Sequence, residues 1–297
     1  MGKQTMEPIL KLGLPKGSLQ DSTINLFSQA GFDIRVSSRS YTPEIDDPEV
    51  SCLMFRSQEM GRYVAQGIID CGIAGHDWIV ESGVDIQEVS ELAFSRATSQ
   101  PFRWVLAVPV DSSISQANDL EGGTIATELV GVTKRYFADR GISVNVEFSW
   151  GATEIKAGFV DAIVDGTETG SSLRANNLRI VDELLTSTTR LVANHEAWAD
   201  PIKRQKIEAI DILLQGALAA RTKVGLKINV PKEKLEEVLS IIGSDGEHAP
   251  AISRLVDQKW VALEVILDER SERELIPILE RAGASGFVSY PLNKVIS

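Results

Sequence analysis

The segment from residue 161 to 173, D-A-I-V-D-G-T-E-T-G-S-S-L, carries residue types and spacing suited to chemistry. A short apolar run is followed by a turn rich in Gly, Thr and Ser, and then by a predicted first helical turn. This order suits a phosphate group, because loop amides and the positive end of the helix dipole point at one anion. An ordinary strand-to-helix turn capped by Ser171 or Ser172 is the alternative interpretation.

Two carboxylates and several hydroxyls add to this segment. Asp161 and Asp165 lie four residues apart at the two ends of the apolar run. Asp165 should emerge at the carboxyl end of the strand, where open α/β sheets place their ligands. Gly170 should allow a backbone conformation that a Cβ atom would block. The candidate hydroxyl donors are those of Thr167, Thr169, Ser171 and Ser172.

Lys16 and Gly17 form a second candidate anion site. They lie between a predicted strand (residues 8–14) and a helix predicted from Ser18 to Ala30, with Gly31 as its stop. Arg56 lies at the carboxyl end of another predicted strand, residues 50–56. A solvated turn lysine is the alternative interpretation of Lys16.

Two more segments combine carboxylates with glycines. In residues 70–77, D-C-G-I-A-G-H-D, the glycines Gly72 and Gly75 flank an apolar strand end beside Asp70 and Asp77. This pattern predicts close approach of backbone to ligand, or a tight turn before a helix over 78–82. Glu154 follows G-A-T and falls in the first turn of a predicted helix, where a carboxylate can also serve simply as a cap.

The elements that position these residues alternate between strand and helix, which favours parallel α/β sheets. A long helical stretch, residues 196–220, is predicted to connect this core to the rest of the chain. Residues 222–297 then read as strand, helix, strand, strand, helix, strand, the pattern of a ferredoxin-like domain. The predicted domains are lobe I (1–95 and 189–221), lobe II (96–188) and the ferredoxin-like domain (222–297).

Composition narrows the class of protein. The chain has 297 residues and a formal net charge of -12, which argues against nucleic acid as the main partner. We find no apolar run near the roughly 20 residues of a membrane helix and no signal-peptide core, so a cytoplasmic protein without membrane contact is expected. Cys52 and Cys71 could form one bridge but are better explained as small core residues.

The sequence resembles the long form of the ATP phosphoribosyltransferase family over nearly its whole length. The resemblance rests on G-L-P-K-G-S-L (13–19), Arg56, residues 70–77, and G-A-T-E-I, D-A-I-V-D and T-G-S-S-L within residues 151–173. The ending G-A-S-G-F-V-S-Y-P-L-N-K also resembles the family's C-terminal regulatory domain. The resemblance implies a bilobal, periplasmic-binding-protein-like catalytic core with a ferredoxin-like, ACT-like domain after it.

The resemblance also implies a reaction and its participants. Phosphoribose would pass from phosphoribosyl pyrophosphate to N1 of ATP, with release of pyrophosphate, as the first step of histidine biosynthesis. Mg2+ is the implied cofactor, with its protein ligands unknown. Histidine is the implied effector at the C-terminal domain, and a homo-oligomer, dimer or hexamer, is the implied assembly.

Site roles follow from the same resemblance. The loop from Thr167 to Ser172 would hold the 5-phosphate of the ribose donor. Asp165 would contact the hydroxyls of the ribose. Lys16 and Arg56 would face the pyrophosphate or ATP phosphates, and Glu154 would assist near the ribose or metal. The implied catalytic residues are Lys16, Arg56, Glu154 and Asp165. The implied donor loop is Asp165, Thr167, Glu168, Thr169, Gly170, Ser171 and Ser172. The implied ATP side is Lys16, Gly17, Arg56, Asp70, Gly75 and Asp77.

Some positions depart from the family pattern. Gly166 and Glu168 stand where the family more often has an apolar and a small residue. In the C-terminal domain, Lys227, Ala251 and Arg254 depart from many relatives, which bears on inhibition by histidine. A solute-binding protein with two lobes, or a phosphoribosyltransferase with another acceptor base, are the alternative functions.

Overall fold

The computed structural model describes residues 7–37, 40–92, 102–243 and 250–296, and the chain divides into two compact units, Met1–Asp211 and Ile212–Ser297. The first unit begins with β1 (Leu10–Lys16), α1 (Gln20–Ala30), β2 (Ile34–Arg35), β3 (Glu44–Ile45), β4 (Val50–Arg56), α2 (Ser57–Ala65), β5 (Cys71–Gly75), α3 (His76–Ser82) and β6 (Gln87–Leu92). It continues with β7 (Phe102–Pro109), η1 (Ala117–Leu120), β8 (Thr124–Thr127), α4 (Val130–Ala138), β9 (Asn145–Phe148), α5 (Thr153–Lys156), β10 (Ala162–Thr167), α6 (Ser171–Ala175), β11 (Leu178–Ser187), β12 (Thr189–Ala193), α7 (His195–Ala199) and α8 (Pro201–Ala220).

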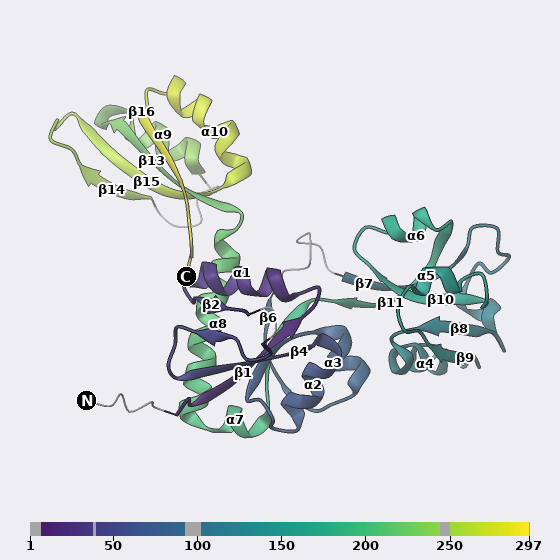
Figure 1. The fold of residues 1–297 in the computed structure, drawn as a ribbon. Coiled ribbons are helices and arrows are strands. Elements are labelled where there is room, and N and C mark those ends of the chain that lie inside the picture. The colour runs from purple at the N-terminus through teal and green to yellow at the C-terminus, as the bar shows by residue number, and fades with distance from the viewer. Residues whose placement is uncertain (1–6, 38–39, 93–101, 244–249, 297) are drawn as a thin grey trace. The chain divides into compact units, whose positions relative to one another are not determined.

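The first sheet has the order β4-β1-β5-β12-β6. Strand β1 runs parallel to β4 and β5, so Lys16 and Arg56 lie next to each other at the carboxyl edge. Strand β12 is antiparallel to both of its neighbours. The alternation predicted parallel sheets, and this sheet is instead mixed. Strand β11 leads directly into β12 (Figure 1), so the returning chain enters this sheet from the opposite direction.

The second sheet has the order β11-β7-β10-β8-β9 and is also mixed. Strand β10 runs parallel to β8 but antiparallel to β7. Successive side chains of a strand point to opposite faces of this sheet, so each face packs against its own apolar core. One face packs Trp104 and Leu106 with Phe137 of α4, while the other packs Val105 with Leu173 of α6.

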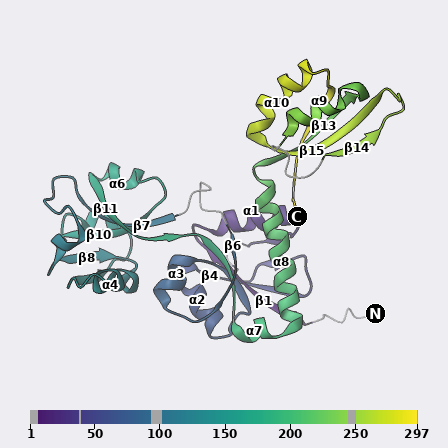
Figure 2. The same cartoon turned by 180° about the vertical axis from the view of Figure 1, so that it is seen from behind.

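Two helix predictions are corrected. The helix predicted from Ser18 begins at Gln20, with Leu19 as its preceding residue, although Gly31 does end it in the left-handed conformation, at φ 100°. The single helix predicted over residues 196–220 is two helices, α7 and α8, as Figure 2 shows. Asp200 between them is extended, at ψ 117°, because the ring of Pro201 disfavours a helical conformation in the residue before it.

The second unit contains the end of α8 and then β13 (Lys223–Pro231), η2 (Lys232–Lys234), α9 (Leu235–Ile242), β14 (Ala251–Arg254), β15 (Trp260–Asp268), α10 (Glu269–Arg281) and β16 (Ser285–Pro291). Its sheet order is β14-β15-β13-β16, with every neighbouring pair antiparallel. The predicted ferredoxin-like order is therefore confirmed. Its apolar core lies between this sheet and α9 and α10. The domain boundaries predicted at residues 95, 188 and 221 stay predictions.

Candidate functional site

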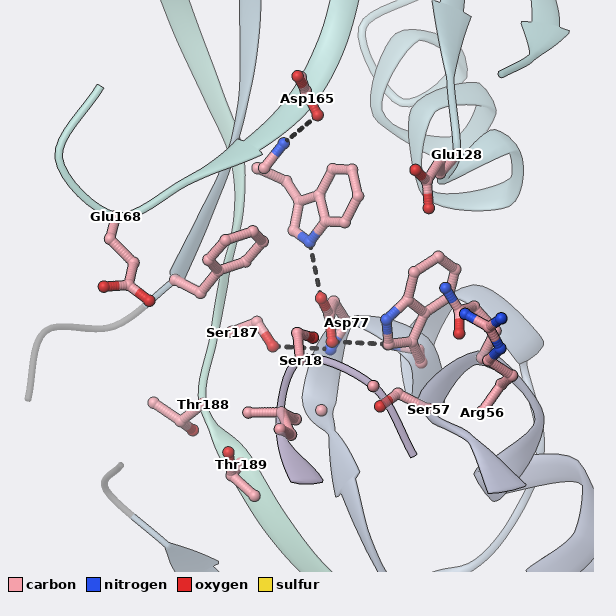
Figure 3. Close-up of a pocket in the computed structure, with 18 of the residues that line it drawn as sticks. Ser18, Arg56, Ser57, Asp77, Glu128, Asp165, Glu168, Ser187, Thr188 and Thr189 are labelled. Atoms are coloured by element: carbon pink, nitrogen blue, oxygen red, sulfur yellow. Dashed lines mark hydrogen bonds between the residues drawn. The ribbon is translucent and has the colours of Figure 1, made fainter. Parts of the chain in front are cut away.

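A cavity of about 520 Å3 lies in the first unit, at the carboxyl ends of strands from both sheets. Its walls come from the ends of β1, β4 and β5 in the first sheet, and from β8 and β10 in the second. Figure 3 shows Asp165 and Glu128 on one side, with Arg56, Ser57 and Ser18 on the other. The parallel strands of each sheet end together, which brings residues distant in sequence to one place.

Many of the predicted site residues meet in this cavity. Lys16, Gly17 and Arg56 line its first-sheet side. Lys16 is the last residue of β1, and its ammonium nitrogen lies 3.7 Å from the centre of the Tyr41 ring. That contact holds the cation at the cavity edge. The further predicted residues in the lining are Gly75, Asp77, Glu154, Asp165 and Glu168.

Carboxylates gather on the second-sheet side. Burial raises the pKa of Asp165 to about 6, the backbone N–H of Gly166 opposes that rise, and the charges of Glu154 and Glu128 add to it. The N–H of Gly166 donates to Asp165 Oδ1 at 2.8 Å. Glu128 was missed by the sequence interpretation. Its signal was the same as that of Asp165, since it directly follows the short strand β8.

The predicted phosphate loop begins later than expected, because β10 extends to Thr167. Gly170, at φ 73°, precedes α6, so the alternative of a Ser171 or Ser172 cap is wrong. Its N–H donates to Thr167 Oγ1 at 2.7 Å. Within the described range, Asp165 and Glu168 of the predicted loop residues line the cavity, and the rest lie outside its lining.

Two side-chain hydrogen bonds involve loop residues outside the cavity lining. Thr169 Oγ1 donates to Ser171 Oγ at 3.1 Å. Ser172 donates to the carboxylate of Glu154, which itself lines the cavity. The loop is thus connected to the cavity wall through Glu154.

The two aspartates of the 70–77 segment lie at opposite ends of β5. Asp70 precedes the strand and accepts from Lys11 N and Lys203 Nζ, both at 2.7 Å. Asp77 follows the strand and lies in the cavity wall. Its carboxylate accepts from Trp104 Nε1 at 2.8 Å and from Trp78 N at 3.0 Å. The predicted ATP-side segment is therefore divided, with Gly75 and Asp77 at the cavity and Asp70 away from it.

An aromatic wall was also missed by the sequence interpretation. The rings of Phe102 and Trp104 pack edge to face, with centres 5.8 Å apart, and Trp104 packs likewise on Trp78 at 6.0 Å. All three residues line the cavity. Residues 102 and 104 alternate along β7 and so share one face, which was the available signal. Their meeting with Trp78 depends on the tertiary structure.

The described residues form neither a metal site made of protein ligands alone nor a disulfide. Among the described residues, no group of three His, Cys, Asp or Glu side chains could hold a metal ion. Cys52 and Cys71 are both buried and free, and burial raises the pKa of Cys52 to about 12. The bridge left open by the sequence is therefore ruled out. In the described part of the chain, no helix is long and apolar enough to cross a membrane.

Comparisons with known proteins agree with these observations. The family model described as HisG, ATP phosphoribosyltransferase, matches residues 56–216, and that of the HisG C-terminal domain matches residues 220–294. An ATP phosphoribosyltransferase of Thermodesulfovibrio yellowstonii is 55% identical over 98% of this chain and 99% of that protein. One of Prosthecochloris aestuarii is 56% identical over 97% of this chain and 98% of that protein.

A solved structure shows a similar fold. The ATP phosphoribosyl transferase (HisG:HisZ) complex from Thermotoga maritima contains a chain that is 29% identical, with a TM-score of 0.60. The match covers 69% of the present chain and 96% of that chain.

Proposed function

The chain belongs to the ATP phosphoribosyltransferase family, and we propose that the cavity in its first unit binds both substrates of the family's reaction. That reaction, the first step of histidine biosynthesis, transfers phosphoribose from phosphoribosyl pyrophosphate to N1 of ATP. The observation that carries the assignment is the opposition of charges in one cavity. Lys16 and Arg56 line one side, while Glu128, Glu154 and Asp165 line the other.

The ribose donor fits the carboxylate side. Asp165, two residues before the end of β10, lines the cavity and would accept hydrogen bonds from the ribose hydroxyls. The loop from Thr167 to Ser172 follows directly and would hold the 5-phosphate with its amides and hydroxyls. Glu154 joins the two regions, since it lines the cavity and accepts a hydrogen bond from Ser172.

The ATP side fits the first-sheet edge. Lys16 and Arg56 are neighbours in register and supply positive charge for the phosphates of ATP or the departing pyrophosphate. Gly75 and Asp77 shape the adjoining wall, because a Cβ atom on Gly75 would lie 2.3 Å from Asp77 Oδ1. We leave Asp70 out of the site, since its carboxylate is engaged at the other end of β5.

The chemistry needs positioning more than acid or base catalysis. The lone pair of adenine N1 forms a bond to the anomeric carbon as the bond from that carbon to the pyrophosphate oxygen breaks. The electron pair of the broken bond leaves with pyrophosphate, while the ribose ring becomes cationic. Asp165 and Glu154 favour that cation, and Lys16 and Arg56 favour the departing anion. Correct positioning of the two substrates is worth roughly 7–11 kcal/mol.

The carboxylates of the cavity also suit the Mg2+ of this family. This ion prefers oxygen ligands and is usually held by one or two carboxylates together with substrate phosphates. Glu154 and Glu128 are the residues we propose for that role. When bound, the ion neutralises charge on the departing pyrophosphate.

For the second unit we propose regulation by histidine and assembly with further copies of this chain, in the cytoplasm. The support is its ferredoxin-like fold and its match to the HisG C-terminal domain. Lys227, Ala251 and Arg254, the positions that depart from many relatives, all lie exposed on its strands. Because these positions differ from many relatives, inhibition by histidine has to be measured on this protein itself.

The proposed function is tested by incubating the protein with ATP, phosphoribosyl pyrophosphate and Mg2+. Mass spectrometry follows pyrophosphate and N1-substituted ATP, with each substrate and the metal omitted in turn. We expect product only in the complete mixture. Turnover of another base, with ATP left unmodified by folded protein, would assign the cavity to a different acceptor.

A further inference from the structure

Phe102 occupies the space that a side chain at position 166 would need. In the register of β10 and β7, Gly166 pairs with Trp104, so its missing side chain would lie on the same face as Phe102 and Trp104. A Cβ atom on Gly166 would lie only 2.2 Å from Phe102 Cζ. Gly166 thus lets the Phe102 ring lie directly against the β10 backbone.

The ring is held in this position by its neighbours. Phe102 packs at an interplanar angle of 80° on Trp104, which packs at 85° on Trp78. Trp104 is itself fixed by the hydrogen bond from its indole to the buried carboxylate of Asp77. An aromatic surface that is already oriented loses little conformational freedom when it binds a ligand.

The end of β10 separates this aromatic surface from the carboxylate side. Ile163 packs in the core with Leu173, whereas Val164 packs in the core with Trp104. By alternation, Asp165 belongs to the face of Ile163, and Gly166 to the face of Val164. Both residues nevertheless line the cavity. A ribose held by Asp165 would therefore face the same cavity as the aromatic surface.

We propose that Phe102, lying against Gly166, is the surface on which the purine of ATP stacks, and that it determines specificity for the acceptor base. This inference rests on the proposed function. A purine has a flat apolar face that an aromatic ring complements. A purine stacked there would share one cavity with a ribose held by Asp165, whereas the phosphates of either substrate gain nothing from an aromatic ring.

The test compares Phe102→Leu with wild type in steady-state kinetics. Leucine keeps apolar volume in the second-sheet core but removes the flat ring. We expect the KM for ATP to rise about tenfold, the effect of losing one base stack, with the KM for phosphoribosyl pyrophosphate unchanged. Inorganic triphosphate, which carries the phosphates without the base, should inhibit both proteins with the same constant.

Two further variants and a control sharpen this test. Phe102→Tyr keeps the ring and should retain the wild-type KM for ATP. Gly166→Ala should displace the ring and reproduce the effect of Phe102→Leu. Phe159→Ala is the control, because Phe159 is 83% exposed and lies outside the cavity lining. Circular dichroism melts confirm that each variant is folded.

Equal increases in KM for both substrates, weaker inhibition by triphosphate in Phe102→Leu, or an unchanged KM for ATP would overturn the inference. Such results leave the proposed function intact, because wild type would still convert ATP. If wild type converts no ATP at all, the proposed function has failed instead.

Discussion

The carboxylate of Asp77 in α3 accepts the indole N–H of Trp104 in β7 at 2.8 Å. Helix α3 follows β5 of the first sheet, whereas β7 belongs to the second, so this bond links the two halves of the first unit. Ser187 Oγ adds to the link by accepting the N–H of Asp77 at 3.0 Å. One wall of the cavity therefore depends on a buried polar contact.

Asp77→Ala is expected to lower the free energy of unfolding by about 2 kcal/mol, since it leaves a buried indole N–H without its charged acceptor. Asp77→Asn keeps an acceptor oxygen and should cost less. Urea denaturation measures both, with the exposed Asp111→Ala as control. A loss from Asp111→Ala as large as that from Asp77→Ala would contradict the importance of this bond.

Asp165 should make stability depend on pH. The folded pKa is about 6 and the ordinary value is 3.8, so the unfolded chain ionises first as the pH rises. The contribution of Asp165 to the free energy of unfolding is therefore fully present below pH 3.8. It is lost as the pH rises from 3.8 towards 6. Asp165→Asn removes this loss and should stabilise the metal-free protein by about 3 kcal/mol above pH 6.

Urea denaturation of wild type and Asp165→Asn at pH 4 and pH 7.5 checks this expectation. The gain should be much smaller at pH 4, while activity should be lost at both values. An equal gain at the two pH values would attribute the stabilisation to something other than the ionisation of Asp165.

Gly170 and Gly122 provide a matched pair for the phosphate loop. Both have positive φ, 73° and 76°. A Cβ on Gly122 would meet no atom within 4 Å, whereas one on Gly170 would lie 2.9 Å from Arg174 Nη1, the end of a flexible side chain. Replacing either with Ala should cost roughly 1 kcal/mol of stability, because a Cβ disfavours this conformation. Gly170→Ala alone should also raise the KM for phosphoribosyl pyrophosphate, with little change for ATP. Equal effects of the two variants on that KM would argue against the loop.

Asp70→Ala should affect stability without affecting catalysis. The change removes the acceptor of Lys11 N and Lys203 Nζ and is expected to cost about 2 kcal/mol. Thermal melts and steady-state kinetics measured together separate the two effects. An increased KM for ATP in a fully folded variant would return Asp70 to the ATP side of the site.

A chain ending at Ala220 should fold and lose its response to histidine. The reason is that β13 to β16 form their own sheet and core with α9 and α10. Histidine titration at several concentrations of phosphoribosyl pyrophosphate, with full-length and shortened protein, makes the comparison. Competitive inhibition that survives the truncation would place the effector in the catalytic cavity.

Local sequence signals were sufficient for many elements. Strand β4 has the predicted bounds, Val50–Arg56, and Glu154 lies in the first turn of α5, as predicted. Gly31 ends α1 because glycine adopts the left-handed conformation without steric cost. The ferredoxin-like order followed from the predicted order of strands and helices in residues 222–297. These features depend on residues close together in the chain, so the sequence by itself determined them.

Other features were decided by the tertiary structure. Glu128, Phe102 and Trp78 were not recognised because each gains its role from neighbours contributed by other strands and helices. Asp70 and Asp77 look equivalent in sequence, yet a strand of β5's length places them at opposite edges of a sheet. Which carboxylates share a cavity, and which are used in the scaffold, depends on strand order and direction, and these are set by long-range packing.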